Sequence, residues 1–507
     1  MRGFLFSLIV ISIYCLRKTA WSCGDGVFTI MEKFLTYTIK TGLLLVIFSV
    51  LLYFNSSMYP FFTLKTAVIQ SIIEILTALW LALIIFYPQH RPRLTLVVIS
   101  LLILLIVLFL SSLLGVNFYK SIFSTQARLT GVFLITHIVL FFFLLSSVNV
   151  SFWRWLWWAS LGVASVSTIF GALGNFFAQN LFRSLAYSRD NSLFGNPSFL
   201  AGYLLFNVFV GLLLFASEEK KWVKIPAGIL TAIIAFGILL TQTIGAMAGL
   251  MAGVLVALVY YVFQLPRSLK GLLPNSIFRP FAKFSTGETK KVHEDTPHIR
   301  SLFSFLPPAK RDENFAKSSK REFGSSPLKK NFLTGILLLI LVFNGVFWMT
   351  KSSSFWRYFP GLSRVAQTDL SGVLRNRFIA WQAGWQAWQE RPLLGYGWEN
   401  FNVAFNKFYN PILLTAVATE TYWDKTHSIF LEYLFNAGAI GLLAFLFLLG
   451  AVFYEAFRAK PLPIFIIAGL AAYIVQGLVV FDTLGVYLML GMYLSYVDVN
   501  YRQKISN

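Results

Sequence analysis

The stretch LTLVVISLLILLIVLFLSSLL, residues 94–114, is the clearest indication of the class of fold. It contains no Lys, Arg, Asp or Glu, and about 20 apolar residues suffice for a helix to cross the hydrocarbon core of a bilayer. The apolar residues form one continuous block and do not alternate with polar ones, which favours a membrane helix over a strand of a membrane β-barrel. The sequence therefore predicts an all-α, polytopic membrane protein.

Comparable apolar blocks recur through the 507-residue chain, of which 57% is hydrophobic and only 12% charged. A soluble globular domain carries about 25% charged residues, so the composition argues against an ordinary soluble protein. We predict about 12 transmembrane helices, at residues 35–55, 67–87, 94–114, 130–148, 154–175, 198–216, 225–241, 245–264, 332–349, 427–453, 462–480 and 482–498. An even number of helices places both termini on the same side of the membrane.

The net charge of +21 has a marked distribution along the chain. Most of the excess lies in short loops on one side of the predicted membrane and in the long basic loop 265–331. Because Lys and Arg stay on the cytoplasmic side of membrane proteins, this pattern predicts that the termini and this loop are cytoplasmic. Basic chains can also bind nucleic acid, but charges placed in this way indicate membrane orientation, and we expect no nucleic-acid partner.

The hydropathy pattern divides the chain into six segments. They are an N-terminal extension or mis-assigned start (1–34), transmembrane helices 1 to 8 (35–264), a basic disordered cytoplasmic loop (265–331), transmembrane helix 9 (332–349), an extracytoplasmic catalytic loop with amphipathic helices (350–426), and transmembrane helices 10 to 12 with a short cytoplasmic tail (427–507). Met31 offers a second start before the first long apolar block. The outer loop contains Trp, Tyr and short motifs, and a long loop with its own structure usually carries function.

An arginine and three tryptophans share one face of a predicted helix in the outer loop. Arg377, Trp381, Trp385 and Trp388 follow helical spacing, and Pro392 ends the helix. The helix could lie in the membrane interface as an aromatic anchor. Alternatively, the planar guanidinium of Arg377 could bind a phosphate through two hydrogen bonds. The spacing alone leaves both interpretations open.

A histidine stands where the tenth predicted span begins. Thr426 is a favourable N-cap residue, which would place His427 at the outer mouth of the helix, where the helix dipole favours anions. Asp424 lies three residues earlier, and Glu420 is near. This group could supply a general base or a phosphate ligand, and a histidine at such an interface can also be structural.

Several arginines are predicted on the outer side, against the rule that orients membrane proteins. They are Arg128, Arg183 and Arg189. Together with His427 they favour a site for an anion such as a lipid-linked sugar pyrophosphate, although contacts with lipid phosphates would explain them too. His137 lies within a predicted span, and we expect a packed polar residue there rather than a ligand.

Three motifs resemble the O-antigen ligase/O-antigen polymerase (Wzy-C type) superfamily of bacterial membrane glycan transferases. They are the helix from Arg377 to Trp381, the turn Pro392-Leu393-Leu394-Gly395-Tyr396-Gly397, and His427-Ser428 followed by Gly438-Ala439-Ile440-Gly441-Leu442. Arg128-x-x-Gly131 and Phe481-Asp482 are weaker matches. The resemblance covers most of residues 35–498, and residues 375–442 are its specific part.

The resemblance implies a metal-independent, inverting transferase of the membrane GT-C type, without a cofactor, in the bacterial inner (cytoplasmic) membrane. It would move a glycan from undecaprenyl pyrophosphate to an acceptor on the extracytoplasmic side. By motif position, His427 and Arg377 would be catalytic. The donor pyrophosphate would be bound by Arg377, Arg375, Arg128 and Arg189, with support from Trp381, Asp424, Gly395, Gly397 and Asp482.

Two positions depart from the family pattern. Family members usually carry an arginine in the turn before the eighth helix, where this chain has Ile244. Either Arg128, Arg189 or Arg375 replaces that charge, or the activity is weakened. Ser428 replaces a common asparagine. The favoured function is an O-antigen ligase, with an O-antigen polymerase or a protein O-oligosaccharyltransferase as alternatives of the same chemistry, and a lipid-linked sugar transporter or flippase as an alternative of another class.

Overall fold

The computed structural model describes residues 25–54, 57–181, 192–263, 335, 338–339, 342–343, 345–358, 362–367, 370–415, 422–459 and 461–506. Within these ranges the chain forms helices and turns and contains no strand. Eight helices are long and apolar enough to cross a membrane by length and composition. The prediction of an all-α, multi-pass membrane protein is therefore confirmed for this part of the chain.

The eight long apolar helices are α2 (Asp25–Phe48), α3 (Thr63–Phe86), α4 (Leu96–Leu113), α7 (Val150–Leu181), α8 (Pro197–Ser217), α9 (Lys221–Thr241), α10 (Ile244–Phe263) and α17 (Ile429–Arg458). Two shorter apolar helices, α6 (Val132–Ser146) and α18 (Ile464–Gly477), and the C-terminal α19 (Leu484–Ser506) match further predicted spans. The predicted span 332–349 is described only in part, so the number of about 12 spans stays a prediction.

Local sequence signals set the ends of several helices. The side chain of Thr95 accepts a hydrogen bond from the Val98 amide and caps α4. Asn196 caps α8 in the same way through the Ser198 amide, and Pro197 occupies the first turn. These side chains satisfy amides that have no partner inside the helix, so the ends of these helices are encoded locally.

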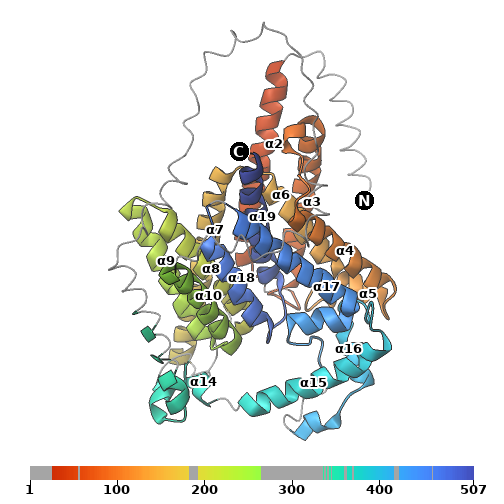
Figure 1. The fold of residues 1–507 in the computed structure, drawn as a ribbon, viewed down its shortest axis with the longest axis vertical. Coiled ribbons are helices and arrows are strands. Elements are labelled where there is room, and N and C mark those ends of the chain that lie inside the picture. The colour runs from red at the N-terminus through yellow and green to blue at the C-terminus, as the bar shows by residue number, and fades with distance from the viewer. Residues whose placement is uncertain are drawn as a thin grey trace.

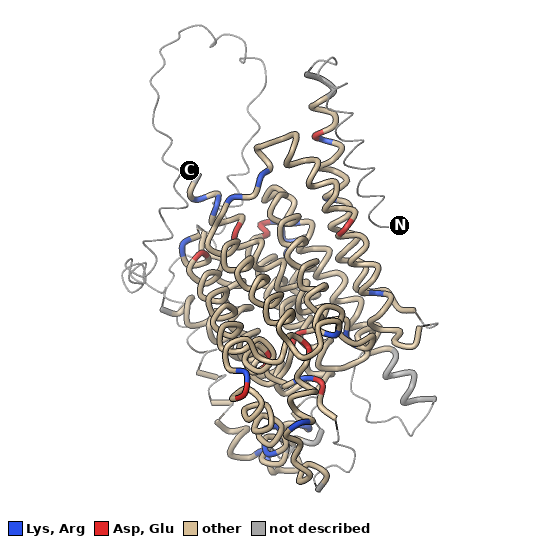
Figure 2. Tube along the Cα trace, turned by 90° about the vertical axis from the view of Figure 1, so that its right-hand side faces the viewer, with Lys and Arg blue, Asp and Glu red and all other residues tan. Residues whose placement is uncertain are grey.

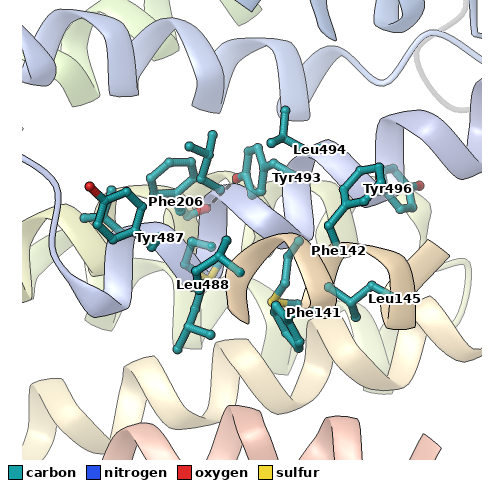
Figure 3. Packing of buried hydrophobic residues seen from close by; sticks show 14 of the residues in the cluster. Phe141, Phe142, Leu145, Phe206, Tyr487, Leu488, Tyr493, Leu494 and Tyr496 are labelled. Carbon is teal, nitrogen blue, oxygen red and sulfur yellow. Dashed lines mark hydrogen bonds between the residues drawn. The ribbon is translucent and has the colours of Figure 1, made fainter. Parts of the chain in front are cut away.

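The core of the bundle is built around α19, which packs against α6 and α8 (Figure 3). The Tyr493 ring meets the Phe206 ring edge-on, with ring centroids 4.8 Å apart, and its hydroxyl donates to the Phe206 carbonyl. Phe141 and Phe142 of α6 fill the other side. A buried tyrosine that finds a hydrogen-bond acceptor keeps its apolar packing without leaving a polar group unsatisfied.

Three short or amphipathic helices gather at the end of the bundle opposite the C-terminus (Figure 1). They are α14 (Leu362–Gln367), α15 (Leu370–Glu390) and α16 (Phe401–Lys407). The helix α15 runs across this end and contacts α16 and the first part of α17. Lys and Arg lie mainly at the two ends of the bundle (Figure 2), which leaves the middle free of most charge.

Candidate active site

The start of α17 differs from the prediction. The helix begins at Ile429 with Ser428 as its N-cap residue, so the assignment of Thr426 as N-cap is wrong. Thr426 instead donates from its amide and its hydroxyl to Oε2 of Glu432, both at 2.9 Å. The carboxylate of the first helical turn reaches back to the preceding segment, and this holds His427 just outside the helix.

His427 adopts a left-handed backbone conformation with φ of +56°, which is uncommon for a residue with a side chain. Its Nδ1 lies 3.1 Å from the Lys425 carbonyl. A carbonyl only accepts, so Nδ1 carries the proton in the neutral ring and Nε2 presents a lone pair. Trp423 and Phe481 pack against the ring, with centroid separations of 4.8 and 5.4 Å.

The environment keeps the His427 imidazole neutral. Burial and the nearby charge of Arg377 lower its pKa to about 4, and Asp424 opposes this only in part. A histidine with this pKa is uncharged at neutral pH and can accept a proton from a reacting group. The arrangement therefore favours a base over a phosphate-binding cation at His427.

Arg377 lies on α15, and its Nη1 donates to the Val479 carbonyl at 2.9 Å. Among the described residues it has no carboxylate partner, and burial lowers its pKa. One turn further along α15, Trp381 Nε1 donates to the Thr426 carbonyl at 2.7 Å. These two bonds fix α15 to the loop after α18 and to the segment that carries His427.

Arg128 and Asp424 form an ion pair next to His427. The Nε and Nη2 atoms of Arg128 lie 2.7 and 3.3 Å from the two carboxylate oxygens. Burial disfavours the charge of Asp424, but Arg128 more than compensates and holds its pKa below the usual range. The Arg128 guanidinium also lies 5.6 and 5.3 Å from the rings of Phe199 and Phe481. The positive charge of Arg128 is thus neutralised by the carboxylate of Asp424.

These groups surround one aromatic residue. Phe481 contacts both the His427 ring and the Arg128 guanidinium, and Arg377 binds the backbone two residues before it. We call Arg128, Arg377, Asp424, His427 and Phe481 the mouth site. The structure therefore brings together three basic side chains that the sequence places about 250 and 50 residues apart.

A buried ion cluster beside the mouth site was not predicted. Lys425 is fully buried and forms an ion pair with Glu399, and its Nζ lies 3.4 Å from Oε1 of Glu432. Burial opposes its charge, but the two glutamates more than compensate and hold the Lys425 pKa above its usual value. Ser124 donates to Glu399 at 2.9 Å, and Lys120 is close enough to interact with the cluster. Glu432 gave the one sequence signal, because a carboxylate in a membrane helix needs a partner.

The remaining predicted residues differ in their placement. Arg375 is exposed on α15, and Arg189 lies outside the described residues. Asp482 is buried and accepts a hydrogen bond from the Tyr473 hydroxyl at 2.9 Å. His137 is buried between a backbone carbonyl and Glu74, as expected for a packed polar residue.

The tryptophans of α15 differ in how far they are buried. Trp381 is half-buried against Thr426, whereas Trp385 is 47% exposed. The buried face of the helix is formed by small residues, Ala380, Ala383, Gly384 and Ala387. Small side chains let α15 approach α17 closely, since a Cβ at Gly384 would overlap the Phe435 ring. Trp385 and Trp388 lie side by side, with ring centroids 4.7 Å apart, so they share a face as the spacing predicts, while the small residues form the buried face.

Gly395 and Gly397 belong to a different feature, which we call the glycine clamp and define as residues 392–397 with 435–440. Here α17 is interrupted at Gly438, which has φ of +70°. The freed carbonyls of Phe435 and Asn436 accept from the Tyr396 and Gly397 amides at 3.2 and 2.8 Å. The Ala439 and Ile440 amides in turn donate to Pro392 and Leu393, at 2.8 and 3.2 Å. The turn thus replaces the missing helical hydrogen bonds of the kink.

Close backbone approach explains the glycines of the clamp. Gly395 has φ of +66°, and a Cβ there would lie 2.5 Å from the Asn436 carbonyl oxygen. A Cβ at Gly438 would overlap the Leu393 carbonyl. Both positions therefore need glycine for space and for backbone conformation. Their motifs hold the turn against the kink of α17.

Ile244 opens α10 and packs in a small apolar cluster with Leu362, Val365 and Ala366 of α14. Neither Arg128 nor Arg375 is seen to replace a charge there, because the first is paired with Asp424 and the second is exposed. Within the described ranges, no group of three or more His, Cys, Asp and Glu side chains is placed to hold a metal ion.

Comparison with known proteins agrees with the resemblance seen in the sequence. Residues 315–446 match the model of a family described as O-antigen ligase. The matched region includes α15, the turn of the glycine clamp, His427 and the kink of α17. Among curated proteins, none matches the chain. The part of the chain that contains α15, His427 and the glycine clamp is therefore similar to the O-antigen ligase family, whereas Arg128 and Phe481 of the mouth site lie outside the matched region.

Proposed function

We propose that the protein is an O-antigen ligase-like glycosyltransferase that moves a glycan from undecaprenyl pyrophosphate to a lipid or other surface acceptor on the extracytoplasmic face. The observation that carries this proposal is the mouth site, where a neutral histidine lies beside an arginine without a carboxylate partner. A base and an uncompensated cation are what a hydroxyl nucleophile and an anionic leaving group require.

In the proposed reaction the acceptor hydroxyl attacks the anomeric carbon of the first sugar. A new C–O bond forms as the bond between that carbon and the pyrophosphate oxygen breaks. The hydroxyl proton passes to Nε2 of His427, and the electron pair of the broken bond stays on the pyrophosphate. The Arg377 guanidinium stabilises the charge that develops on this leaving group.

Donor binding would also raise the basicity of His427. The charge of Arg377 is the second largest cause of the low His427 pKa, after burial. An anion bound to Arg377 offsets that charge, so the His427 pKa rises when the donor is present. The histidine thus stays neutral in the free protein and becomes a better proton acceptor in the complex.

The orientation of the chain supports the choice of membrane face. The helices α14 to α16, among them α15 with Arg377 of the mouth site, lie at the end opposite the C-terminus (Figure 1). The C-terminal tail with Arg502 and Lys504 is cytoplasmic by the distribution of basic residues. The mouth site then faces the extracytoplasmic side, where a lipid-linked glycan would be presented.

The test is glycan transfer by the purified chain from a synthetic undecaprenyl-pyrophosphate oligosaccharide, without nucleotide, to separate lipid, glycan and protein acceptors. We expect covalent product with one acceptor and its loss in Arg377→Ala, with partial activity in Arg377→Lys because the charge remains but the planar fork is lost. The acceptor that is labelled identifies ligase, polymerase or protein transfer. Vectorial movement of the donor in proteoliposomes without any covalent product would instead indicate a transporter and refute the proposal.

A further inference from the structure

A pocket opens between the helix α2 and the start of α7. Its volume is about 370 Å³, within the range of about 300–1,000 Å³ that small-molecule sites occupy. The turn from α6 into α7 lies beside the C-terminal tail, because Arg502 Nη2 donates to the Ser146 carbonyl at 2.6 Å. The pocket is therefore at the end of the bundle opposite α14 to α16 (Figure 1), and the distribution of basic residues indicates that this end is cytoplasmic.

Lys40 of α2 is a half-buried cation in this pocket. Its Nζ lies 5.6 Å from the ring centroids of both Tyr37 and Phe152, and such rings attract a cation without accepting its hydrogen bonds in full. In the described part of the chain, no carboxylate lies within ion-pair distance of this ammonium group, and no acceptor forms a hydrogen bond with it. An ammonium group has three N–H donors, so Lys40 keeps all three for a ligand.

Neutral polar side chains share the pocket with Lys40. Thr41 belongs to the same helix, and Asn149 and Ser151 stand on either side of the first residue of α7. All three are exposed, so their hydroxyl and amide groups can bind the oxygens and hydroxyls of a polar ligand. The described residues that line the pocket include no acidic side chain. The pocket thus carries one positive charge, which favours a singly charged anion that also bears hydroxyl groups.

Two exposed aromatic residues indicate that the pocket lies at the membrane surface. Tyr37 is 67% and Trp155 is 68% exposed, and both line the pocket. Tyr and Trp gather at the level of the lipid headgroups, because each has an apolar ring and a polar atom that needs a hydrogen-bond partner. Residues 42–48 of α2 are apolar and follow Lys40 into the bundle. A phospholipid can therefore place its headgroup on Lys40 while its acyl chains stay in the bilayer.

We propose that this pocket binds the headgroup of an anionic phospholipid, a phosphatidylglycerol, from the cytoplasmic leaflet. Its phosphodiester carries the single negative charge that Lys40 matches, and its glycerol hydroxyls can bind Asn149 and Ser151. A phosphatidylethanolamine has the same phosphate but adds an ammonium group, which Lys40 repels. Basic pockets between membrane helices on this side suit acidic headgroups. The inference is independent of the proposed glycan transfer, because the pocket is at the other end of the bundle.

The experiment measures ligand binding to the full-length chain in detergent by native mass spectrometry, with phosphatidylglycerol, phosphatidylethanolamine or glycerol 3-phosphate as the probe. The variants are Lys40→Ala, Lys40→Arg and Lys33→Ala. Lys33 is the matched control, since it is an exposed lysine of the same helix outside the pocket. We expect the wild type to bind phosphatidylglycerol most tightly. Lys40→Ala should weaken this binding by about 10- to 100-fold, the value of a hydrogen bond to a charged group, whereas Lys40→Arg and Lys33→Ala should stay close to the wild type.

A second measurement locates the bound lipid and guards against misfolding of one variant. A photoreactive phosphatidylglycerol should label a peptide that contains residues 149–155 in the wild type, and Lys40→Ala should lose this label. Ser151→Trp fills the pocket and leaves the lysine in place, so it should weaken phosphatidylglycerol binding as well. Thermal unfolding without added lipid checks that each variant is folded.

Three results would overturn the proposal. They are equal affinity of the wild type for phosphatidylglycerol and phosphatidylethanolamine, unchanged phosphatidylglycerol binding in folded Lys40→Ala, and labelling that never reaches residues 149–155. Binding of glycerol 3-phosphate as tight as that of phosphatidylglycerol would mean that the pocket takes a soluble phosphate ester, which would overturn its assignment to a lipid. Loss of binding in both Lys40→Ala and Ser151→Trp, with Lys33→Ala unaffected, is the result that supports it.

Discussion

The mouth site and the glycine clamp come from neighbouring motifs of one sequence, but they solve different physical problems. In the clamp, the hydrogen bonds across the kink join backbone groups, and the carbonyls freed at Gly438 accept from amides of the turn at residues 392–397. In the mouth site, side-chain groups retain unused capacity, namely the lone pair of His427 and the guanidinium of Arg377. A motif that is internally satisfied serves structure, whereas one with unsatisfied, positioned groups is ready for a ligand.

The two regions are joined by the buried cluster around Lys425. Lys425 lies two residues before His427. Its partner Glu399 lies two residues after the turn of the clamp, and its other partner Glu432 belongs to α17. The position of His427 therefore depends on the clamp through buried ion pairs. Four predictions test how far the regions are separable, from the largest expected effect to the smallest.

The largest effect is expected at His427. Replacing His427 by Ala removes the proposed base and should lower the rate of glycan transfer by about 100- to 10,000-fold, while the thermal unfolding midpoint stays close to that of the wild type. The control is His90→Ala, since His90 pairs with Glu32 far from the mouth site. Normal transfer by His427→Ala would show that the mouth site is not the reacting centre.

The second largest effect is expected for the substitution of Lys425, which should destabilise the mouth site and the glycine clamp together. Lys425→Met leaves Glu399 and Glu432 buried without their cation, and breaking a buried ion pair costs about 3–5 kcal/mol of unfolding free energy. Lys407→Met is the matched control, because Lys407 pairs with Glu390 on the surface and exposed ion pairs contribute little to stability. Denaturation in detergent measures both. Equal stability of the two variants would mean that the cluster does not link the regions.

A smaller loss is expected in the clamp alone. Gly438→Ala forces a residue with a side chain into a left-handed conformation, at about 1–2 kcal/mol, and adds an overlap with the Leu393 carbonyl. Gly450→Ala on the same helix is the control, because nothing lies within 4 Å of a Cβ there. We expect Gly438→Ala to lower the unfolding midpoint, with transfer per folded molecule less affected than in His427→Ala. An unchanged midpoint would count against the clamp.

The smallest expected effect is that of pH, because kcat/KM should change little between pH 7 and 5.5. The His427 pKa of about 4 means that the free protein keeps its base unprotonated as pH falls from 7 to 5.5. The acid limb of kcat/KM, which reports the free protein, should therefore have its midpoint near 4, and that of kcat should lie higher because the bound anion offsets Arg377. An acid limb of kcat/KM near 6.5, the ordinary histidine value, would show that His427 is not held neutral in this way.

The fold class and the residue types of the site could be read from the sequence, but their partners could not. Apolar blocks of about 20 residues predict membrane helices because the bilayer fixes that length. The motif positions pointed to Arg377, His427 and Asp424, which the structure brings together. They did not show that Arg128 is neutralised by Asp424 or that Trp385 faces outward, because both depend on how distant helices pack.

The sequence by itself determined that the chain is a multi-pass helical membrane protein and that residues 375–442 resemble the O-antigen ligase family, because hydropathy and short motifs are local properties. Tertiary structure alone decided which charges remain available. Lys425 pairs with Glu399 and Glu432, Arg128 pairs with Asp424, and Arg377 binds the Val479 carbonyl some 100 residues away. Whether a charged group forms an ion pair within the protein or stays available to a ligand depends on distances across the fold, and no local sequence pattern encodes these distances.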